Sequence, residues 1–319
     1  MAGEYTPVSN IEQQAQLSLD LRDISAVTGK SPIDWAKVKV IYEKGANSKK
    51  GDGSARTFMG VATKKEVLAQ FPHGAQILGS ADFLNANVQA AIAVTGRAKG
   101  LGDAARRQLV DKGILAILYG EFLEEMEAAQ NKVKQGMTDN AKGAPHNVDE
   151  AWAYYAGAKD GDGKYGYALA STAGKRERNF KIEGKVDGPL QRALAATLRG
   201  AQQGDLKALD AGIAEARGYL NAIFYLASLR YVSNLAADAT AADRESHAAE
   251  GWGFFQAIRP AVASASVDAA KTVESVYACP ASQPVTAKDV TAVYQALNSP
   301  GVLQVLGIPR ALVFTAPTG

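Results

Sequence analysis

An imperfect internal repeat is the feature that most constrains how this chain folds. Trp35 and Trp152 each precede a Gly-Asp-Gly triplet, at residues 51–53 in the first copy and 161–163 in the second. A third, truncated start surrounds Trp252, so the three tryptophans of the chain all lie in repeat segments. One unit of this kind cannot bury its apolar stripe alone, and such units therefore stack as helix pairs or bundles. We expect the tryptophans to take equivalent positions and to anchor the core.

The repeat divides the chain into three segments. Residues 1–32 form an N-terminal segment, residues 33–148 the first copy, and residues 149–319 the second copy together with the truncated third start. Each copy is predicted to run through one helix, the Gly-Asp-Gly loop and two longer helices. A chain of 319 residues can bury a substantial core. We therefore expect the segments to fold into one compact domain.

Composition and periodicity favour helix almost throughout. Ala, Leu, Glu, Gln and Lys fill the periodic stretches, and runs of β-branched residues are rare. The prediction is an all-α fold, a helical bundle in which at least half of the residues are helical. The stretch with the clearest strand character, 311–314, is too short to found a sheet. The first 30 residues are expected to be partly helical, with a break at 29–32. The clearest predicted helices cover residues 83–96, 104–133, 190–200, 205–238, 241–258, 265–276 and 286–298.

Charge and motif content argue against several classes of function. The net charge is +2 and the basic residues are scattered, which argues against nucleic acid as a partner. The single cysteine, Cys279, excludes an internal disulfide and a thiolate metal cluster. The sequence contains no Gly-rich phosphate loop, no Gly-x-Ser-x-Gly elbow and no His-Glu-x-x-His motif. We therefore expect a protein that is not an enzyme.

No segment is expected to insert into a membrane. The longest apolar stretch, 113–119, is far shorter than the roughly 20 residues that span a bilayer as a helix. The N-terminus lacks the basic-then-apolar profile of a signal peptide. The residues alone therefore leave two locations open: the cytosol, or a compartment reached through a signal that this sequence does not include.

Two of the three histidines lie beside carboxylates at helical spacing. His247 and Glu250 are three residues apart and His146 and Glu150 are four apart, so each pair shares one face of a helix. An imidazole and a carboxylate on one face form half of a transition-metal site. Two other interpretations stay open. Asn147 with Glu150 also fits an N-terminal capping box, and the His247 pair also fits an ordinary surface or core histidine.

Glu121 and Glu125 on the preceding helix are the candidate partner carboxylates. They follow Leu118 on the stripe that also holds Ile114. Two carboxylates at four-residue spacing repel each other unless a cation or a base lies between them, so they are either solvated or linked by a metal. The connection 135–145 is rich in Gly and polar residues and short enough for an antiparallel return. The helix that follows it is therefore predicted to pack against the acidic stripe.

The Gly-Asp-Gly loops match a calcium loop only in part. Asp160 and Asp162 are two residues apart, but the twelfth position of an EF-hand loop falls on Ser171, which cannot replace the glutamate required there. A tight turn is the favoured interpretation, because Gly and Asp are typical turn residues.

Four segments carry a family resemblance. His146-Asn-Val-Asp-Glu-Ala-Trp precedes Lys175-Arg176-x-Arg178-Asn179-Phe180, and the other two segments are Gly51-Asp-Gly-Ser-x-Arg56-Thr57 and His247-Ala-Ala-Glu-Gly-Trp-Gly-Phe-Phe. These segments resemble the Fe-assimilating proteins of green algae, also called low-iron-inducible periplasmic proteins. The matching segments extend from about residue 34 to about residue 260. The resemblance implies a periplasmic or secreted protein that helps to capture iron under limitation, and it implies no particular ligands.

The first hypothesis is therefore an extracytoplasmic iron-binding protein that assists iron assimilation, with a membrane iron transporter or reductase as its partner. An iron ion fits the candidate groups because ferric iron prefers oxygen donors with some imidazole. The predicted metal ligands are Glu121, Glu125, His146, Glu150, His247 and Glu250.

Two alternatives use other features of the chain. A binding module for a small anion such as bicarbonate would use basic side chains, although ion pairs with carboxylates are the favoured interpretation of those residues. A structural helical-repeat protein of the cell surface would bind no ligand. The basic residues in question are Arg56, Lys175, Arg176 and Arg178.

Overall fold

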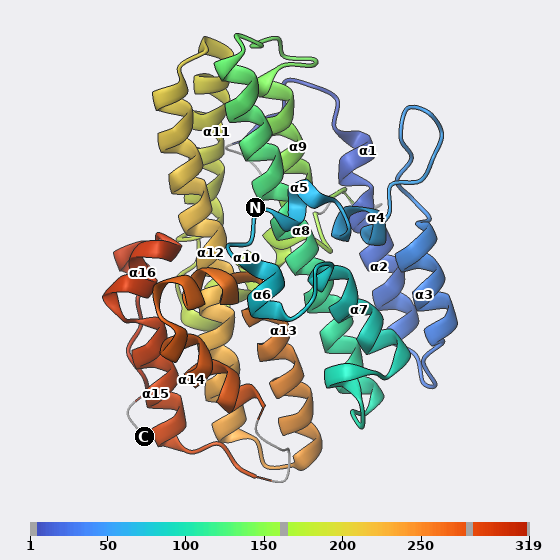
Figure 1. Ribbon diagram of the computed structural model, residues 1–319, viewed down its shortest axis with the longest axis vertical. Helices are drawn as coiled ribbons and strands as arrows, with labels where there is room; N and C mark the ends of the chain where they lie inside the picture. The colour runs from blue at the N-terminus through green and yellow to red at the C-terminus, as the bar shows by residue number, and fades with distance from the viewer. Residues whose placement is uncertain (1–4, 160–164, 279–282, 318–319) are drawn as a thin grey trace. The chain divides into compact units, whose positions relative to one another are not determined.

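The computed structural model describes residues 5–159, 165–278 and 283–317 (Figure 1). It is 71% helical and its described residues form no β-strand, so the predicted all-α class is confirmed. The helices are, in chain order, α1 (Glu12–Ala15), α2 (Leu17–Thr28), α3 (Trp35–Lys44), α4 (Phe58–Ala62), α5 (Lys65–Leu68), α6 (Gly74–Leu78), α7 (Phe83–Ala93), η1 (Gly96–Ala98), α8 (Asp103–Lys134), α9 (Ala144–Ala156), α10 (Leu169–Phe180), α11 (Asp187–Gln203), α12 (Leu206–Ala237), α13 (Ala241–Ala265), α14 (Val267–Tyr277), α15 (Ala287–Leu297), α16 (Pro300–Leu306) and η2 (Arg310–Leu312).

The long helices lie where the periodicity predicts them. The predicted segments 104–133 and 205–238 correspond to α8 and α12, with ends that differ by one residue. The strand character assigned to 311–314 is wrong. Residues Arg310–Leu312 form the single 3-10 turn η2, closed by a hydrogen bond from the Leu312 N–H to the Pro309 carbonyl oxygen at 2.8 Å.

The chain divides into two compact units. The first contains Met1–Gln70 and Ile117–Leu220, and the second contains Phe71–Ala116 and Asn221–Gly319. The chain passes from one unit to the other at Ala116–Ile117, inside α8, and again at Leu220–Asn221, inside α12. These units are discontinuous in sequence. They are a different division from the predicted segments 1–32, 33–148 and 149–319, which stay a prediction.

Helix α9 lies at the centre of the first unit, where it contacts α1, α10 and α11. It begins with Pro145 in its first turn, where a missing N–H costs no hydrogen bond. It ends at Gly157, whose φ of +74° is the left-handed conformation that glycine adopts without strain. A Cβ there would lie 2.7 Å from the hydroxyl oxygen of Ser18 on α2. Glycine therefore lets the chain leave α9 close against α2.

One stripe of α8 points inward, as predicted. Ile114, Leu118, Glu121 and Glu125 follow one another at spacings of three or four residues, and all four are buried. Two glutamates on a buried stripe are unusual, because burial of a carboxylate is costly unless it is paired or hydrogen-bonded. The surroundings of these two side chains are therefore the part of the first unit to examine for function.

The second unit is organised around α13, which packs against α14, α16 and α6. Phe254, Phe255 and Ile258 of α13 are buried in its core. Gly251 permits the close approach of α14, because a Cβ at this position would overlap the ring of Tyr277. The unit therefore relies on small residues at helix contacts as well as on large apolar side chains.

The tryptophans take different positions in their helices, contrary to the prediction. Trp35 is the first residue of α3, whereas Trp152 lies near the C-terminal end of α9 and Trp252 lies in the middle of α13. Only Trp152 is fully buried, at 4% exposure. Helix α3 begins at Trp35 itself, whereas α9 begins at Ala144, well before Trp152. The prediction did not take this difference into account. The internal repeat as a whole stays a prediction.

The two Gly-Asp-Gly loops do share one local feature. An isolated antiparallel bridge joins Lys49 to Ala55 across the first loop, and another joins Lys159 to Tyr165 across the second. In the first loop, Asp52 accepts hydrogen bonds from the Ser54 N–H at 2.9 Å and from its hydroxyl at 2.6 Å, as in a tight turn. The calcium alternative for the second loop concerns residues that lie outside the described ranges.

One stretch, Gly74–Ala98, reaches a mean hydropathy of 1.2, which by length and composition is enough for a membrane span. In the structure it contains α6, α7 and η1, with intervening turns. The longest of these, α7, has 11 residues, about half of what a helix needs to cross a bilayer.

Candidate metal centre

Three glutamates gather on one face of α8 in the first unit. One oxygen from each of Glu121, Glu124 and Glu125 lies within 4.8 Å of the other two. Glu121 and Glu125 are only 2% and 6% exposed, and Glu124 is half-buried. In an octahedral site with metal–oxygen distances of about 2.1 Å, opposite ligand oxygens lie roughly 4.2 Å apart. The three carboxylates therefore stand close to the spacing that one metal ion requires.

Lys64 supplies a cation on one side of this cluster. It precedes α5, and its Nζ lies 2.9 Å from Oε1 and 3.0 Å from Oε2 of Glu121. The same Nζ donates to Oε2 of Glu124 at 3.3 Å. The side chain of Lys64 keeps 36% exposure. The ammonium group is therefore bound to the cluster and also has access to solvent.

Helix α9 approaches the other side of the cluster with Asn147 and Glu150. The Nδ2 of Asn147 donates to Oε2 of Glu125 at 2.6 Å and lies 3.5 Å from Oε2 of Glu150. Gln14 of α1 donates to the second oxygen of Glu150. The predicted packing of this helix against the acidic stripe is therefore confirmed. The capping-box alternative is wrong, because α9 begins at Ala144 and Asn147 lies inside it.

His146 faces the same carboxylate. Its Nε2 lies 3.6 Å from Oε1 of Glu150, and its Nδ1 lies 2.8 Å from the hydroxyl oxygen of Ser9. Ser9 has a single hydroxyl proton, which it donates to Oδ2 of Asp149 at 2.7 Å. Its oxygen must then accept from the Nδ1–H of His146. In its neutral form, an imidazole that donates from Nδ1 carries its lone pair on Nε2, towards Glu150, which is the orientation that a metal-ligating histidine requires.

Burial sets the protonation of the cluster. It raises the pKa of Glu125 well above its ordinary value, and the charges of Glu150, Glu121 and Glu124 raise it further. Burial also raises the pKa of Glu121, although Lys64 opposes this shift. For Lys64, burial alone would lower the pKa, but Glu121 and Glu124 hold it above the ordinary value. A metal-free cluster therefore holds a proton on Glu125 more readily than a solvated carboxylate does.

Two polar atoms beside the cluster are buried without a hydrogen-bond partner among the described residues, Nη1 of Arg56 and Oδ1 of Asn147. Burial raises the pKa of Glu121 and of Tyr154, and the charge of Arg56 opposes both shifts. A further polar group or a water molecule would satisfy this buried donor and this buried acceptor.

The charges of the cluster do not balance. Glu121, Glu124, Glu125 and Glu150 are four carboxylates, and Lys64 and Arg56 are two cations, so full ionisation leaves two negative charges in excess. A buried excess of this kind requires either protons or a cation. Oxygen donors with one imidazole nitrogen match the preference of hard and borderline metals, among them iron.

The second predicted pair, His247 and Glu250, is arranged differently within the second unit. The Nδ1 of His247 lies 2.8 Å from Oδ2 of Asp238, and the carboxylate of Glu250 lies 3.1 Å from Nζ of Lys112. The Nε2 of His247 lies 3.5 Å from Nδ2 of Asn234. His247 and Glu250 therefore contact different side chains. These contacts do not bring the two residues together as Glu125 and Glu150 are brought together in the first unit.

Comparison with known protein families shows which family this chain belongs to. The sequence profile described as low iron-inducible periplasmic protein matches residues 1–257, which include both histidine pairs and the whole acidic cluster. The chain belongs to this family. No protein with curated annotation and no solved structure matches it.

Membership of the low iron-inducible periplasmic family confirms the resemblance noted from the sequence and gives the protein a periplasmic or secreted location. Within this family member, four of the six predicted ligands lie in the first unit: Glu121, Glu125, His146 and Glu150. The structure brings Glu121 and Glu125 together on α8 and places Glu150 of α9 near Glu125. His146 lies beside Glu150.

Sequence reasoning missed several members of the cluster in this low iron-inducible periplasmic protein. Glu124 belongs to the same glutamate run, and its position on the face of Glu121 and Glu125 was available from helical spacing. Lys64 and Gln14 come from segments distant in sequence, so no local pattern points to them. The expected ion pairs of Arg176 and Arg178 stay a prediction. Arg176 is buried and Arg178 is exposed in the last turn of α10.

Proposed function

We propose that this protein binds iron outside the cytoplasm and assists iron assimilation when iron is scarce. One observation carries the proposal: a cluster of four buried or half-buried carboxylates, with two negative charges in excess at full ionisation, in a protein whose family is induced by low iron. A cation in the cluster would offset the repulsion among the carboxylates and the cost of burying them. Binding and delivery of the ion, rather than catalysis, is the activity we assign.

The proposed ligands are carboxylate oxygens of Glu121, Glu124, Glu125 and Glu150 together with Nε2 of His146. Glu125 is central, since its pKa responds to all three other glutamates of the cluster. Asn147 has its Nδ2 on Glu125, and its Oδ1 remains available. Ser9 fixes the tautomer of His146, as partners outside the coordination sphere commonly do in metal sites.

Lys64 stabilises the site in the absence of a metal ion. Its ammonium group lies next to Glu121 and neutralises the carboxylate that a bound metal ion would otherwise neutralise. Because the side chain is partly exposed, it can turn towards solvent when a metal ion enters and return when the ion leaves. A competing internal cation lowers iron affinity and favours release. Release suits a protein that passes iron to a membrane iron transporter or reductase, which is the partner we propose.

The test is iron binding by the purified protein with ferric iron supplied from a chelate buffer, so that free iron does not hydrolyse. We expect saturable binding by the wild type and a loss of at least about tenfold in affinity for Glu125→Gln. Glu127→Gln is the matched control, because Glu127 lies on the same helix, is exposed and accepts a hydrogen bond from Gln70. Equal affinities for the wild type and Glu125→Gln would overturn the proposal.

A further inference from the structure

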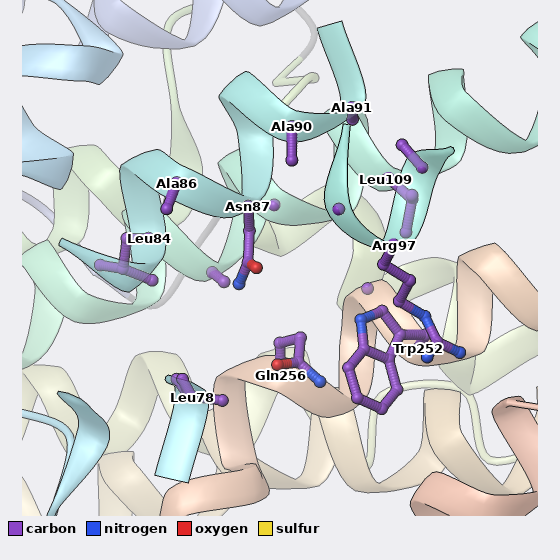
Figure 2. Close-up of a pocket in the computed structure, with 15 residues that line it drawn as sticks. Leu78, Leu84, Ala86, Asn87, Ala90, Ala91, Arg97, Leu109, Trp252 and Gln256 are labelled. Atoms are coloured by element: carbon purple, nitrogen blue, oxygen red, sulfur yellow. The ribbon is translucent and has the colours of Figure 1, made fainter. Parts of the chain in front are cut away.

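A cavity of about 220 Å³ lies inside the second unit, between α7, α8 and α13 (Figure 2). Much of its wall is made of small residues, among them Ala86 and Ala90 of α7, Gly113 of α8 and Gly253 of α13. Leu84 and Leu109 complete an apolar surface. The alanines of α7 leave the space, whereas Gly113 and Gly253 permit close helix contacts with Val88 and Lys112. The leucines make the space favourable for an apolar group.

Gln256 places a polar group in this apolar wall. It is only 7% exposed, and its Nε2 is buried without a hydrogen-bond partner among the described residues. Figure 2 shows the Gln256 side chain on the α13 side of the cavity, with the side chain of Asn87 reaching down from α7 above it. A buried donor without an acceptor retains its full desolvation penalty. A ligand with an acceptor oxygen would relieve it.

Arg97 places a cation at one end of the same cavity. Its guanidinium carbon stacks 3.8 Å above the ring of Trp252, and its Nη2 donates to the carbonyl oxygen of Tyr277 at 2.5 Å. Burial, followed by the charge of Arg259, lowers the pKa of Arg97 to about 10, and the charge of Glu274 opposes this shift. Arg259 is itself paired with Glu274. Within the described part of the chain, no carboxylate lies within salt-bridge distance of Arg97.

The volume limits the size of a ligand. An engineered apolar cavity of about 150 Å³ accommodates benzene, which has six carbon atoms, so about 220 Å³ corresponds to roughly nine non-hydrogen atoms. The three features are an apolar cavity, an unsatisfied donor and a cation with no ion pair to a carboxylate among the described residues. Together they fit one chemical class.

We propose that this cavity binds a small organic carboxylate with a compact apolar body. The apolar body would lie among the alanines and leucines, and the carboxylate would accept from Gln256 and Arg97. The site lies in the second unit and uses none of the proposed iron ligands, so the proposal is independent of iron binding.

Benzoate, with nine non-hydrogen atoms, is the probe. In protein labelled with ¹⁵N at the indole nitrogens, the chain's three tryptophans give three signals, and Trp252→Phe identifies the one from the cavity. Benzoate should move the Trp252 signal saturably, with a Kd of roughly 0.1–5 mM for a ligand this small. The signals of Trp35 and Trp152 should stay in place. Benzamide, which is isosteric and neutral, should bind about tenfold or more weakly.

Three variants complete the test. Gln256→Leu and Arg97→Met should each weaken benzoate binding about tenfold, whereas Gln304→Leu, at an exposed glutamine of α16, should bind as the wild type does. Ala90→Leu fills the cavity and should abolish binding while its thermal unfolding remains cooperative. The proposal is overturned if benzoate moves no tryptophan signal, if benzamide binds equally well, or if Ala90→Leu retains wild-type affinity.

Discussion

The Nδ2 of Asn147 on α9 donates to the buried carboxylate of Glu125 on α8 at 2.6 Å. This hydrogen bond connects the two helices that carry the proposed iron ligands. It also opposes the effect of burial, since a donor to a carboxylate favours the ionised form. The hydrogen bond from Asn147 is outweighed, because burial and three neighbouring glutamates raise the pKa of Glu125 well above its ordinary value. In the metal-free protein, burial and repulsion among the glutamates therefore destabilise the ionised form of Glu125.

A first prediction concerns the stability of the metal-free protein as a function of pH. The pKa of Glu125 is raised in the folded state, so the folded protein holds a proton that the unfolded chain releases. The stabilisation from this proton is fully present below the pKa of the unfolded chain, near 4.3. It is lost as the pH rises through the raised folded-state value. Glu125→Gln should therefore unfold at a higher temperature than the wild type at neutral pH, with the difference shrinking towards pH 4.

Thermal unfolding of both proteins in a chelator from pH 4 to pH 8 measures this difference. Glu127→Gln should follow the wild type across the range, since Glu127 is exposed. A Glu125→Gln variant that is less stable than the wild type at pH 8 would show that Glu125 is ionised and satisfied in the absence of metal.

A second prediction concerns Lys64 as an internal competitor of iron. Lys64→Met removes the cation bound to Glu121, so the metal-free protein should lose stability, and iron should bind about tenfold more tightly because it no longer displaces the ammonium group. Lys65→Met is the matched control, since the Lys65 side chain is 91% exposed and should change neither property. Competition titrations against a ferric chelator give both affinities. Weaker iron binding by Lys64→Met would contradict competition and would make Lys64 a supporting residue.

A third prediction concerns the tautomer of His146. Ser9→Ala removes the hydroxyl group that accepts from Nδ1 of His146 and donates to Asp149. Loss of such a supporting partner typically reduces metal affinity about 10- to 100-fold. Ser264→Ala, at an exposed serine of α13, should leave iron binding unchanged. An unchanged affinity in Ser9→Ala would show that the Ser9 hydroxyl does not support a metal-binding His146.

The sequence predicted the architecture around the site better than its chemistry. Helical spacing was enough to place Glu121 and Glu125 on the inward stripe of α8, and the short connection before α9 predicted that this helix returns against it. Capping by Asn147 stayed open as an alternative because its neighbours match the capping-box pattern, but α9 begins at Ala144, three residues earlier.

Long-range partners explain what the sequence did not reveal. Lys64 reaches Glu121 across 57 positions, and Gln14 reaches Glu150 across 136, so only the folded chain brings them together. The same holds for His247, whose short spacing to Glu250 suggested a shared site, whereas its Nδ1 pairs with Asp238 of a neighbouring segment. Spacing along one helix predicts a shared face, and the residues packed against that face decide its chemistry.

An anomalous difference map, recorded at the iron absorption edge from crystals grown with ferric iron, tests the central claim most directly. We predict one strong peak bounded by the carboxylates of Glu121, Glu124 and Glu125, with Glu150 and Nε2 of His146 towards it. The Nζ of Lys64 should be displaced from the position it takes beside Glu121. A map without a peak in this cluster, or with its strongest peak bound to other residues, would contradict the assignment of iron to this site.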